Sequence, residues 1–109
     1  MADLVAVEVI ATKILEIRGK KVMLDRDLAQ LYGVETRVLN QAVKRNKSRF
    51  PEDFVFSLTR EEIKRISQIV ISLKFSKTVY AFTEQGVAML SQLMGLADAK
   101  KTIRGFAQR

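Results

Sequence analysis

Ten polar side chains with hydrogen-bonding or positively charged groups lie between residues 36 and 49 of this sequence, and eight of them are candidates for contact with a partner. Such groups can contact the edges of nucleic-acid bases and hold phosphates. No acidic residue lies between Glu35 and Glu52, so the stretch carries only positive charge. These residue types therefore suit a polyanionic partner. The eight candidates are Thr36, Arg37, Asn40, Gln41, Lys44, Arg45, Lys47 and Arg49.

The residues from Thr36 to Arg45 divide into two halves when they are placed on a helix. At about 100° per residue, all the polar side chains fall within an arc of roughly 180°. The opposite arc holds the apolar side chains Val38, Leu39, Ala42 and Val43. We therefore expect this helix to bury its apolar half and to expose its polar half.

A second predicted helix precedes this one. Asp25 is expected to cap it, because its carboxylate can accept the unpaired amide hydrogens of the first turn. Leu28 and Leu31 repeat at helical spacing, and Gly33 can adopt the positive φ that often ends a helix. Thr36 is expected to cap the following helix. Two helices joined at such a corner are typical of a DNA-binding helix-turn-helix, and an ordinary corner inside another fold is the alternative.

Length and composition limit the classes of protein to consider. At 109 residues, the chain suffices for one domain with a hydrophobic core and is too short for two. Its net charge of +7 favours nucleic acid or an anionic membrane surface as a partner. Cysteine and histidine are both absent. These absences remove disulfides, thiolate metal sites and the commonest general base, so we expect no cofactor and no metal.

Catalysis would have to rest on carboxylates, lysines or hydroxyls. Asp25 with Asp27, and Glu61 with Glu62, are carboxylate pairs that could hold magnesium. Both pairs are better explained as helix caps and first-turn charges. We therefore predict that the protein is not an enzyme.

The sequence also favours a cytoplasmic location. No apolar run approaches the roughly 20 residues that cross a bilayer. The N-terminal stretch has no basic region and carries Asp3 and Glu8, which is unlike a signal peptide. The lack of cysteine fits a reducing compartment.

The sequence before the predicted corner favours β structure. Residues 4–17 are rich in valine and isoleucine and partly alternate, so we expect a strand there. Ile14–Ile17 and Lys21–Met23 are predicted to form a hairpin around a turn at Arg18–Lys20. The basic side chains of this turn could contact phosphates, although a solvated turn is the simpler interpretation.

Strands and helices alternate after the corner. Apolar residues alternate along residues 54–58, which predicts a strand. Thr59 and Glu62 then predict a capping box, followed by a helix to about residue 70. Residues 77–82 predict another strand, which we expect to pair antiparallel with residues 54–58. The fold class predicted is α+β: a small, winged-helix-like helix-turn-helix domain with short antiparallel hairpin or ribbon elements.

Two further helices are expected near the C-terminus. Thr83 and Gly95 predict the ends of the first one. Residues 97–109 predict the second, with Ile103 and Phe106 on its apolar side. Its pattern continues to the last residue, so we expect either the front part of a longer protein or a helix that packs on a partner.

Three long blocks resemble signature blocks of one family: Ile17–Asn46, Arg49–Glu62 and Tyr80–Leu90. The family is the N-terminal DNA-binding domain of phage open-reading-frame-six proteins, related to the KilA-N and BRO-N domains. The blocks span most of residues 17–90 in the family's order. The resemblance implies a single DNA-binding domain over residues 1–109, from a phage or prophage regulator of the antirepressor type. It also implies that Thr36–Arg45 faces the DNA.

The leading hypothesis is therefore that residues 36–45 lie in the major groove of double-stranded DNA. We expect Arg37 to read guanine, and Asn40 and Gln41 to read adenine or to order water. The remaining candidates would mostly hold phosphates and include the basic flank at 44–49: Thr36, Lys44, Arg45, Lys47 and Arg49.

A protein-interaction module is the second hypothesis. An antirepressor can bind a phage or host repressor instead of an operator. The apolar stripe around Ile103 and Phe106 would then serve as the interface. Homodimerisation through the same stripe is also consistent with a helix-turn-helix, because one copy usually needs a second for useful affinity.

Overall fold

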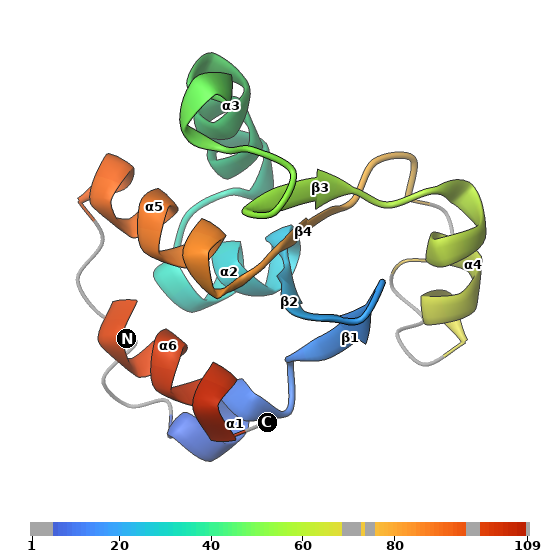
Figure 1. The fold of residues 1–109 in the computed structure, drawn as a ribbon, viewed down its shortest axis with the longest axis horizontal. Helices are drawn as coiled ribbons and strands as arrows, with labels where there is room; N and C mark the ends of the chain where they lie inside the picture. The colour runs from blue at the N-terminus through green and yellow to red at the C-terminus, as the bar shows by residue number, and fades with distance from the viewer. Residues whose placement is uncertain (1–5, 69–72, 74–75, 96–98, 109) are drawn as a thin grey trace.

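A four-stranded antiparallel sheet separates two sets of helices in the computed structural model (Figure 1). The structure describes residues 6–68, 73, 76–95 and 99–108. In chain order the elements are α1 (Val7–Ala11), β1 (Leu15–Ile17), β2 (Lys20–Leu24), α2 (Asp25–Tyr32), α3 (Thr36–Arg45), the 3-10 turn η2 (Lys47–Arg49), β3 (Val55–Ser57), α4 (Arg60–Ser67), β4 (Tyr80–Phe82), α5 (Glu84–Met94) and α6 (Ala99–Gln108). The predicted α+β class is confirmed.

The sheet joins two pairs of strands that the sequence predicted separately. β1 and β2 form the expected hairpin, with Leu15 opposite Val22. β3 and β4 form the expected antiparallel ribbon, with Val55 opposite Phe82. A pairing that was not predicted, between β2 and β4, completes the strand order β1-β2-β4-β3. The hairpin before the helical corner and the ribbon after it therefore belong to one sheet.

Alternation along the strands fills two separate cores, one on each face of the sheet. Met23 packs into a core built with α1, α2, α3, α5 and α6. Its neighbours Val22 and Leu24 point the other way, into a core closed by α4. In β4, Phe82 and Ala81 divide in the same manner. Both faces of the central strands are thus buried, and the helical corner lies on the side of the larger core (Figure 1).

The expected strand over residues 4–17 is only partly correct. Leu15–Ile17 is a strand, but Val7–Ala11 is a short helix, while residues 4 and 5 lie outside the described residues. Ile10 is buried against α6, where Gly105 leaves room for it: a Cβ on Gly105 would lie 2.6 Å from Ile10 Cγ2. Helix packing therefore overrides the β propensity of valine and isoleucine.

α6 packs within the chain. Its Phe106 is buried in the larger core, and the helix lies against α1 and α5. Thr102 of α6 is also fully buried, within 2.9 Å of the hydroxyl of Tyr32 at the end of α2. The last helix thus covers the core and holds the end of α2.

The hairpin turn is fastened to α4 through Arg18. Both Arg18 and Gly19 have positive φ, 56° and 73°, as a two-residue hairpin turn requires. The Arg18 guanidinium binds both carboxylate oxygens of Glu62 at 2.8 and 2.9 Å and lies 4.3 Å from the centroid of the Phe56 ring. Arg18 therefore forms an intramolecular ion pair while its side chain stays partly exposed, so the turn is solvated, as in the simpler interpretation, and also fastened to α4.

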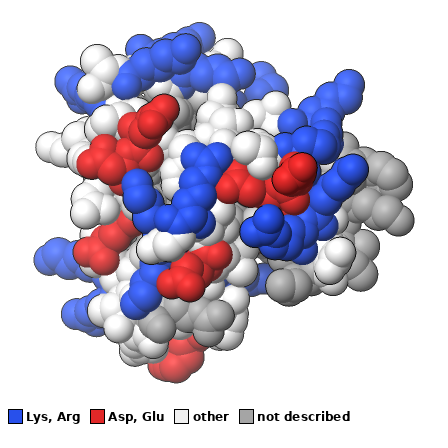
Figure 2. Space-filling model, turned by 45° about the vertical axis from the view of Figure 1, so that its right-hand side comes forward, with Lys and Arg blue, Asp and Glu red and all other residues white. Residues whose placement is uncertain are grey.

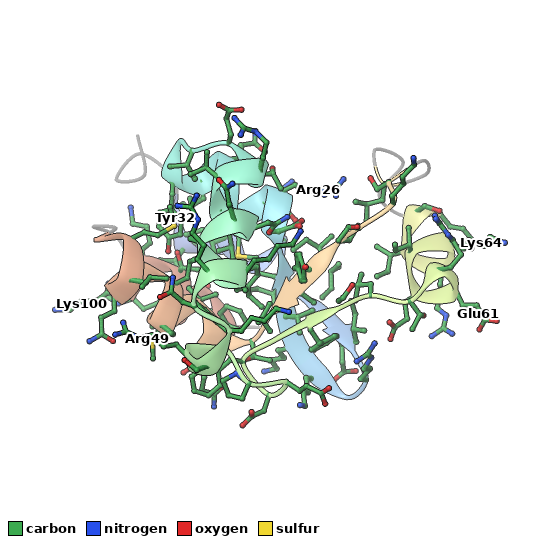
Figure 3. All side chains as sticks on the ribbon, turned by 90° about the horizontal axis from the view of Figure 1, so that it is seen from above. Arg26, Tyr32, Arg49, Glu61, Lys64 and Lys100 are labelled. Carbon is green, nitrogen blue, oxygen red and sulfur yellow. The ribbon has the colours of Figure 1, made fainter. Side chains whose placement is uncertain are left out.

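Glu62 also completes the predicted capping box of α4, which is confirmed. Its carboxylate accepts from the Thr59 amide at 2.8 Å, and its own amide donates to the Thr59 hydroxyl. The Arg18 guanidinium, followed by the Thr59 amide, lowers the pKa of Glu62 from 4.5 to about 2. In contrast, Glu61 and Lys64 on the same helix point into solvent (Figure 3).

Arg18→Gln should weaken the pH dependence of the free energy of unfolding in acid. A lowered carboxylate pKa stabilises the fold above about pH 4.5, and this contribution is lost as the pH falls towards about 2. Because the Arg18 side chain is 42% exposed, we expect a loss of only about 1 kcal/mol at neutral pH. Urea unfolding between pH 2 and 7 measures this effect. The control Lys64→Gln should leave the profile unchanged, and an Arg18→Gln profile parallel to that of the wild type would contradict the assignment.

Candidate nucleic-acid interface

The helical corner is formed by α2, a short turn and α3. Gly33 ends α2 with φ of 68°, as predicted, and the Val34 amide donates to the carbonyl of Ala29. The helix starts differ from the prediction. Leu24 and Glu35 occupy the N-cap positions with extended backbone, and neither helix has a side-chain cap. Asp25 and Thr36 are therefore the first residues of their helices and not the expected N-caps, although the Asp25 carboxylate does accept from one first-turn amide, that of Arg26.

Asp25 instead lies fully buried inside the corner. It is the first residue of α2, which begins directly where β2 ends. Its carboxylate accepts from the Arg26 amide at 2.7 Å, from Asn40 Nδ2 at 2.8 Å and from the Tyr80 amide at 3.2 Å. One side chain thus joins α2 to α3 and to β4. Because a buried carboxylate requires such donors, these contacts fix how α3 sits on the sheet.

Asn40 serves this internal network. It is half-buried, and its Oδ1 is buried without a hydrogen-bond partner among the described residues. The amide group is thus directed into the corner, whereas the sequence placed Asn40 on the exposed polar half. Thr36 is half-buried as well, while Val38 is exposed. The buried side of α3 is therefore rotated by roughly 50° from the predicted one, at about 100° per residue.

The exposed face of α3 retains most of the predicted candidates. Arg37, Gln41, Lys44 and Arg45 are all exposed, and Val38 lies beside them. Leu39 and Val43 on the opposite side are buried in the larger core. The structure thus presents two guanidinium groups, one ammonium group and one amide together along this helix.

The basic flank continues this surface beyond α3. Asn46 donates from Nδ2 to the carbonyl of Ala42, and the chain then forms the single turn η2. Lys47 and Arg49 are exposed on this turn, and the buried Phe50 anchors its end. The flank is therefore held in a defined position next to the helix.

Lys and Arg side chains gather along the upper edge of the molecule, where α3 lies (Figure 2). The nearest acid in sequence, Glu35, lies 3.6 Å from Arg37, and both side chains are 73% exposed. Such an exposed pair is weak and can open at little cost. The face therefore keeps its positive potential.

A hollow of about 320 Å³ runs beside α3. α3 contributes Arg37, Asn40, Gln41 and Lys44 to it, and the chain leading into β4 contributes Thr78 and Tyr80. Thr78 and Tyr80 were not among the sequence-predicted site residues, because nothing in the local pattern joins residues so distant from α3. Together they form a second wall next to the basic face.

Arg26 holds this second wall in place. Its Nη1 donates to Ser76 Oγ at 2.8 Å, and Arg60 Nη1 donates to the Ser76 carbonyl at 3.1 Å. In Figure 3 Arg26 lies on the side of the corner that faces the chain leading into β4. The wall is thus attached to both α2 and α4.

The carboxylates considered for catalysis occupy separate structural positions. Asp25 is bonded inside the corner and Glu62 to Arg18, while Glu61 faces solvent. Burial raises the pKa of Asp27, which lies in a different hollow between α1 and α2. Among the described residues, no three acidic side chains come together in a way that could hold a metal ion. In the same part of the chain, no helix is both long and apolar enough to cross a membrane.

Comparison with the sequence models of known families identifies the family of this chain. The sequence model of the ORF6N domain matches residues 12–93, which is most of the chain. The chain belongs to the ORF6N domain family. Neither a curated protein nor a solved structure matches it. The ORF6N match runs from just before β1 to the end of α5, so it contains the sheet, the helical corner and the basic flank.

Changing Asn40 should test the network that positions α3 in this ORF6N domain. Asn40→Ala removes a donor from a buried carboxylate and should lower the free energy of unfolding by about 2 kcal/mol. Asn40→Asp keeps the shape but places a second carboxylate beside Asp25, so it should cost more at pH 7. Urea unfolding measures both losses. The exposed neighbour Gln41→Ala should change stability by less than about 0.5 kcal/mol. If the Asn40→Asp variant were as stable as the Gln41→Ala variant, the assigned role of Asp25 in positioning α3 would be wrong.

Proposed function

We propose that this ORF6N domain binds double-stranded DNA, with α3 in the major groove. The observation that carries the proposal is the exposed face of α3 together with η2, on which every charged side chain is basic: Arg37, Lys44, Arg45, Lys47 and Arg49. An α-helix fits the major groove, and cations on and beside it neutralise phosphates.

The expected division of contacts follows from position along α3. Residues in the first turns of a recognition helix reach base edges, so Arg37 is assigned to guanine and Gln41 to adenine. Lys44, Arg45 and the flank residues lie farther along and would hold phosphates. Asn40 is not retained as a base contact and Thr36 is not retained as a phosphate contact, because both are half-buried. Asn40 instead orients the helix through Asp25.

The surrounding fold supports the same proposal. The succession of α2, a short turn and α3 is compatible with a helix-turn-helix, and the β3–β4 ribbon follows α3, as a wing would in a winged helix-turn-helix. The hollow between α3 and the chain leading into β4 could accept one strand of the DNA backbone. The ORF6N match, together with the resemblance to KilA-N and BRO-N domains, favours a phage or prophage regulator.

The alternative of a protein-interaction module is less well supported. The apolar stripe expected as its interface is partly used inside the chain, since Phe106 is buried. Association with a repressor protein that is unaffected by changes on the Arg37 face would favour this alternative. Homodimerisation remains compatible with DNA binding.

Removing two cations from α3 should reduce the salt dependence of binding. For Lys44→Ala/Arg45→Ala, the slope of log affinity against log salt should fall by about two, one for each lost phosphate contact. Fluorescence anisotropy with a labelled duplex at several salt concentrations measures the slope. The control Lys64→Ala/Arg65→Ala removes the same charges from α4 and should retain most of the slope. Equal binding by wild type and the α3 double variant would show that another face binds DNA.

Selection from a random duplex library at two salt concentrations tests sequence recognition. We expect an enriched motif, and a palindrome would imply a dimer. On the selected site, Arg37→Ala should reduce discrimination against single-base changes by about tenfold at one position. Lys47→Ala should weaken all sequences alike, because phosphates carry no sequence information. Strong binding at low salt without an enriched motif would indicate a protein that binds only the phosphate backbone, and it would rule out sequence-selective readout.

A further inference from the structure

Val38 is exposed on the surface proposed to face DNA. Its exposed fraction is 39%, whereas Leu39 is fully buried and Val43 is 5% exposed. Val9 on α1, at 50%, is the other large apolar side chain exposed in the part of the chain that the structure describes. Sequence periodicity assigned Val38 to the buried half of its helix, so this position is a finding of the structure.

Folding gives no reason for valine at this position. An exposed valine loses side-chain freedom in a helix and keeps part of its apolar surface in water. α3 is held through Leu39, Val43 and Asn40, and Val38 belongs to neither core. Contact with a binding partner would explain an exposed valine at this position.

The position of Val38 suits contact with a base edge. It lies in the first turn of α3, from which recognition helices reach the floor of the major groove. Gln41 follows three residues later on the same exposed face. The two residues lie about 4.5 Å apart along the helix axis, so their side chains are close enough to contact neighbouring base pairs.

The chemistry of the major groove selects the base. Thymine alone among the four bases places a methyl group there, and apolar side chains recognise it by contact. Glutamine can bind adenine through two hydrogen bonds. We propose that Val38 contacts a thymine methyl next to the base pair read by Gln41, so that the recognised site contains neighbouring A·T pairs. This inference rests on the proposed function and adds a specificity-determining residue to it.

Replacing thymine by deoxyuridine tests the contact directly, because it removes only the methyl group. In the selected duplex, each thymine is replaced in turn, and affinity is measured by anisotropy at fixed salt. Wild-type protein should lose about fourfold in affinity for each thymine that Val38 contacts, as expected for one methyl lost from an apolar contact. Val38→Ala should bind the thymine and uracil duplexes equally well.

Val9→Ala is the matched control, since it shortens the other exposed valine, which lies on another helix. It should keep the fourfold difference between thymine and uracil. Alanine favours helix, so Val38→Ala should fold, and thermal unfolding followed by circular dichroism checks this.

Two results would overturn the inference while DNA binding stands. One is wild-type binding that no uracil replacement weakens, and the other is a Val38→Ala variant that keeps the thymine preference. If the wild type binds no duplex at any salt concentration, the proposed function fails, and the inference fails with it.

Discussion

The buried carboxylate of Asp25 is the constraint on which the position of α3 depends. A charge at 0% exposure requires donors on every side, and here they come from α2, α3 and β4. Two of these elements, α3 and β4, are far apart in sequence. The same group therefore links the start of the helical corner to α3 and to the sheet. Because removal of any donor leaves a buried charge underpaired, this arrangement has few close alternatives.

As a result of this constraint, the different sides of α3 have different roles. One side of the helix is apolar and enters the core through Leu39 and Val43. An intermediate strip carries Asn40, whose polar group is directed inward. Only the remaining side, centred on Gln41, is exposed for contact with a partner. The polar face of an amphipathic helix is thus narrower than its sequence suggests, since polar residues at its border can serve the fold.

Local patterns predicted much of this structure. The hairpin predicted around Arg18–Lys20, the capping box at Thr59 and the ends of α5 all depend on residues close in sequence. All are confirmed, although the hairpin turn itself is only Arg18–Gly19. Contacts such as those of Asp25 with Tyr80 join distant segments, and no local signal announces them. One clue was present in Val22–Leu24, since a continuous apolar run is typical of a strand buried on both faces. That run indicates a central strand and hence the pairing of β2 with β4.

The hydrogen bonds from Arg26 and Arg60 to Ser76 restrict the number of residues between Ser76 and β4. A residue inserted between Ser76 and Tyr80 would shift β4 by one position and turn Ala81 and Phe82 towards the wrong cores. It would also move the Tyr80 amide away from Asp25. Sequence variation in this short segment is therefore restricted in length more tightly than in residue type.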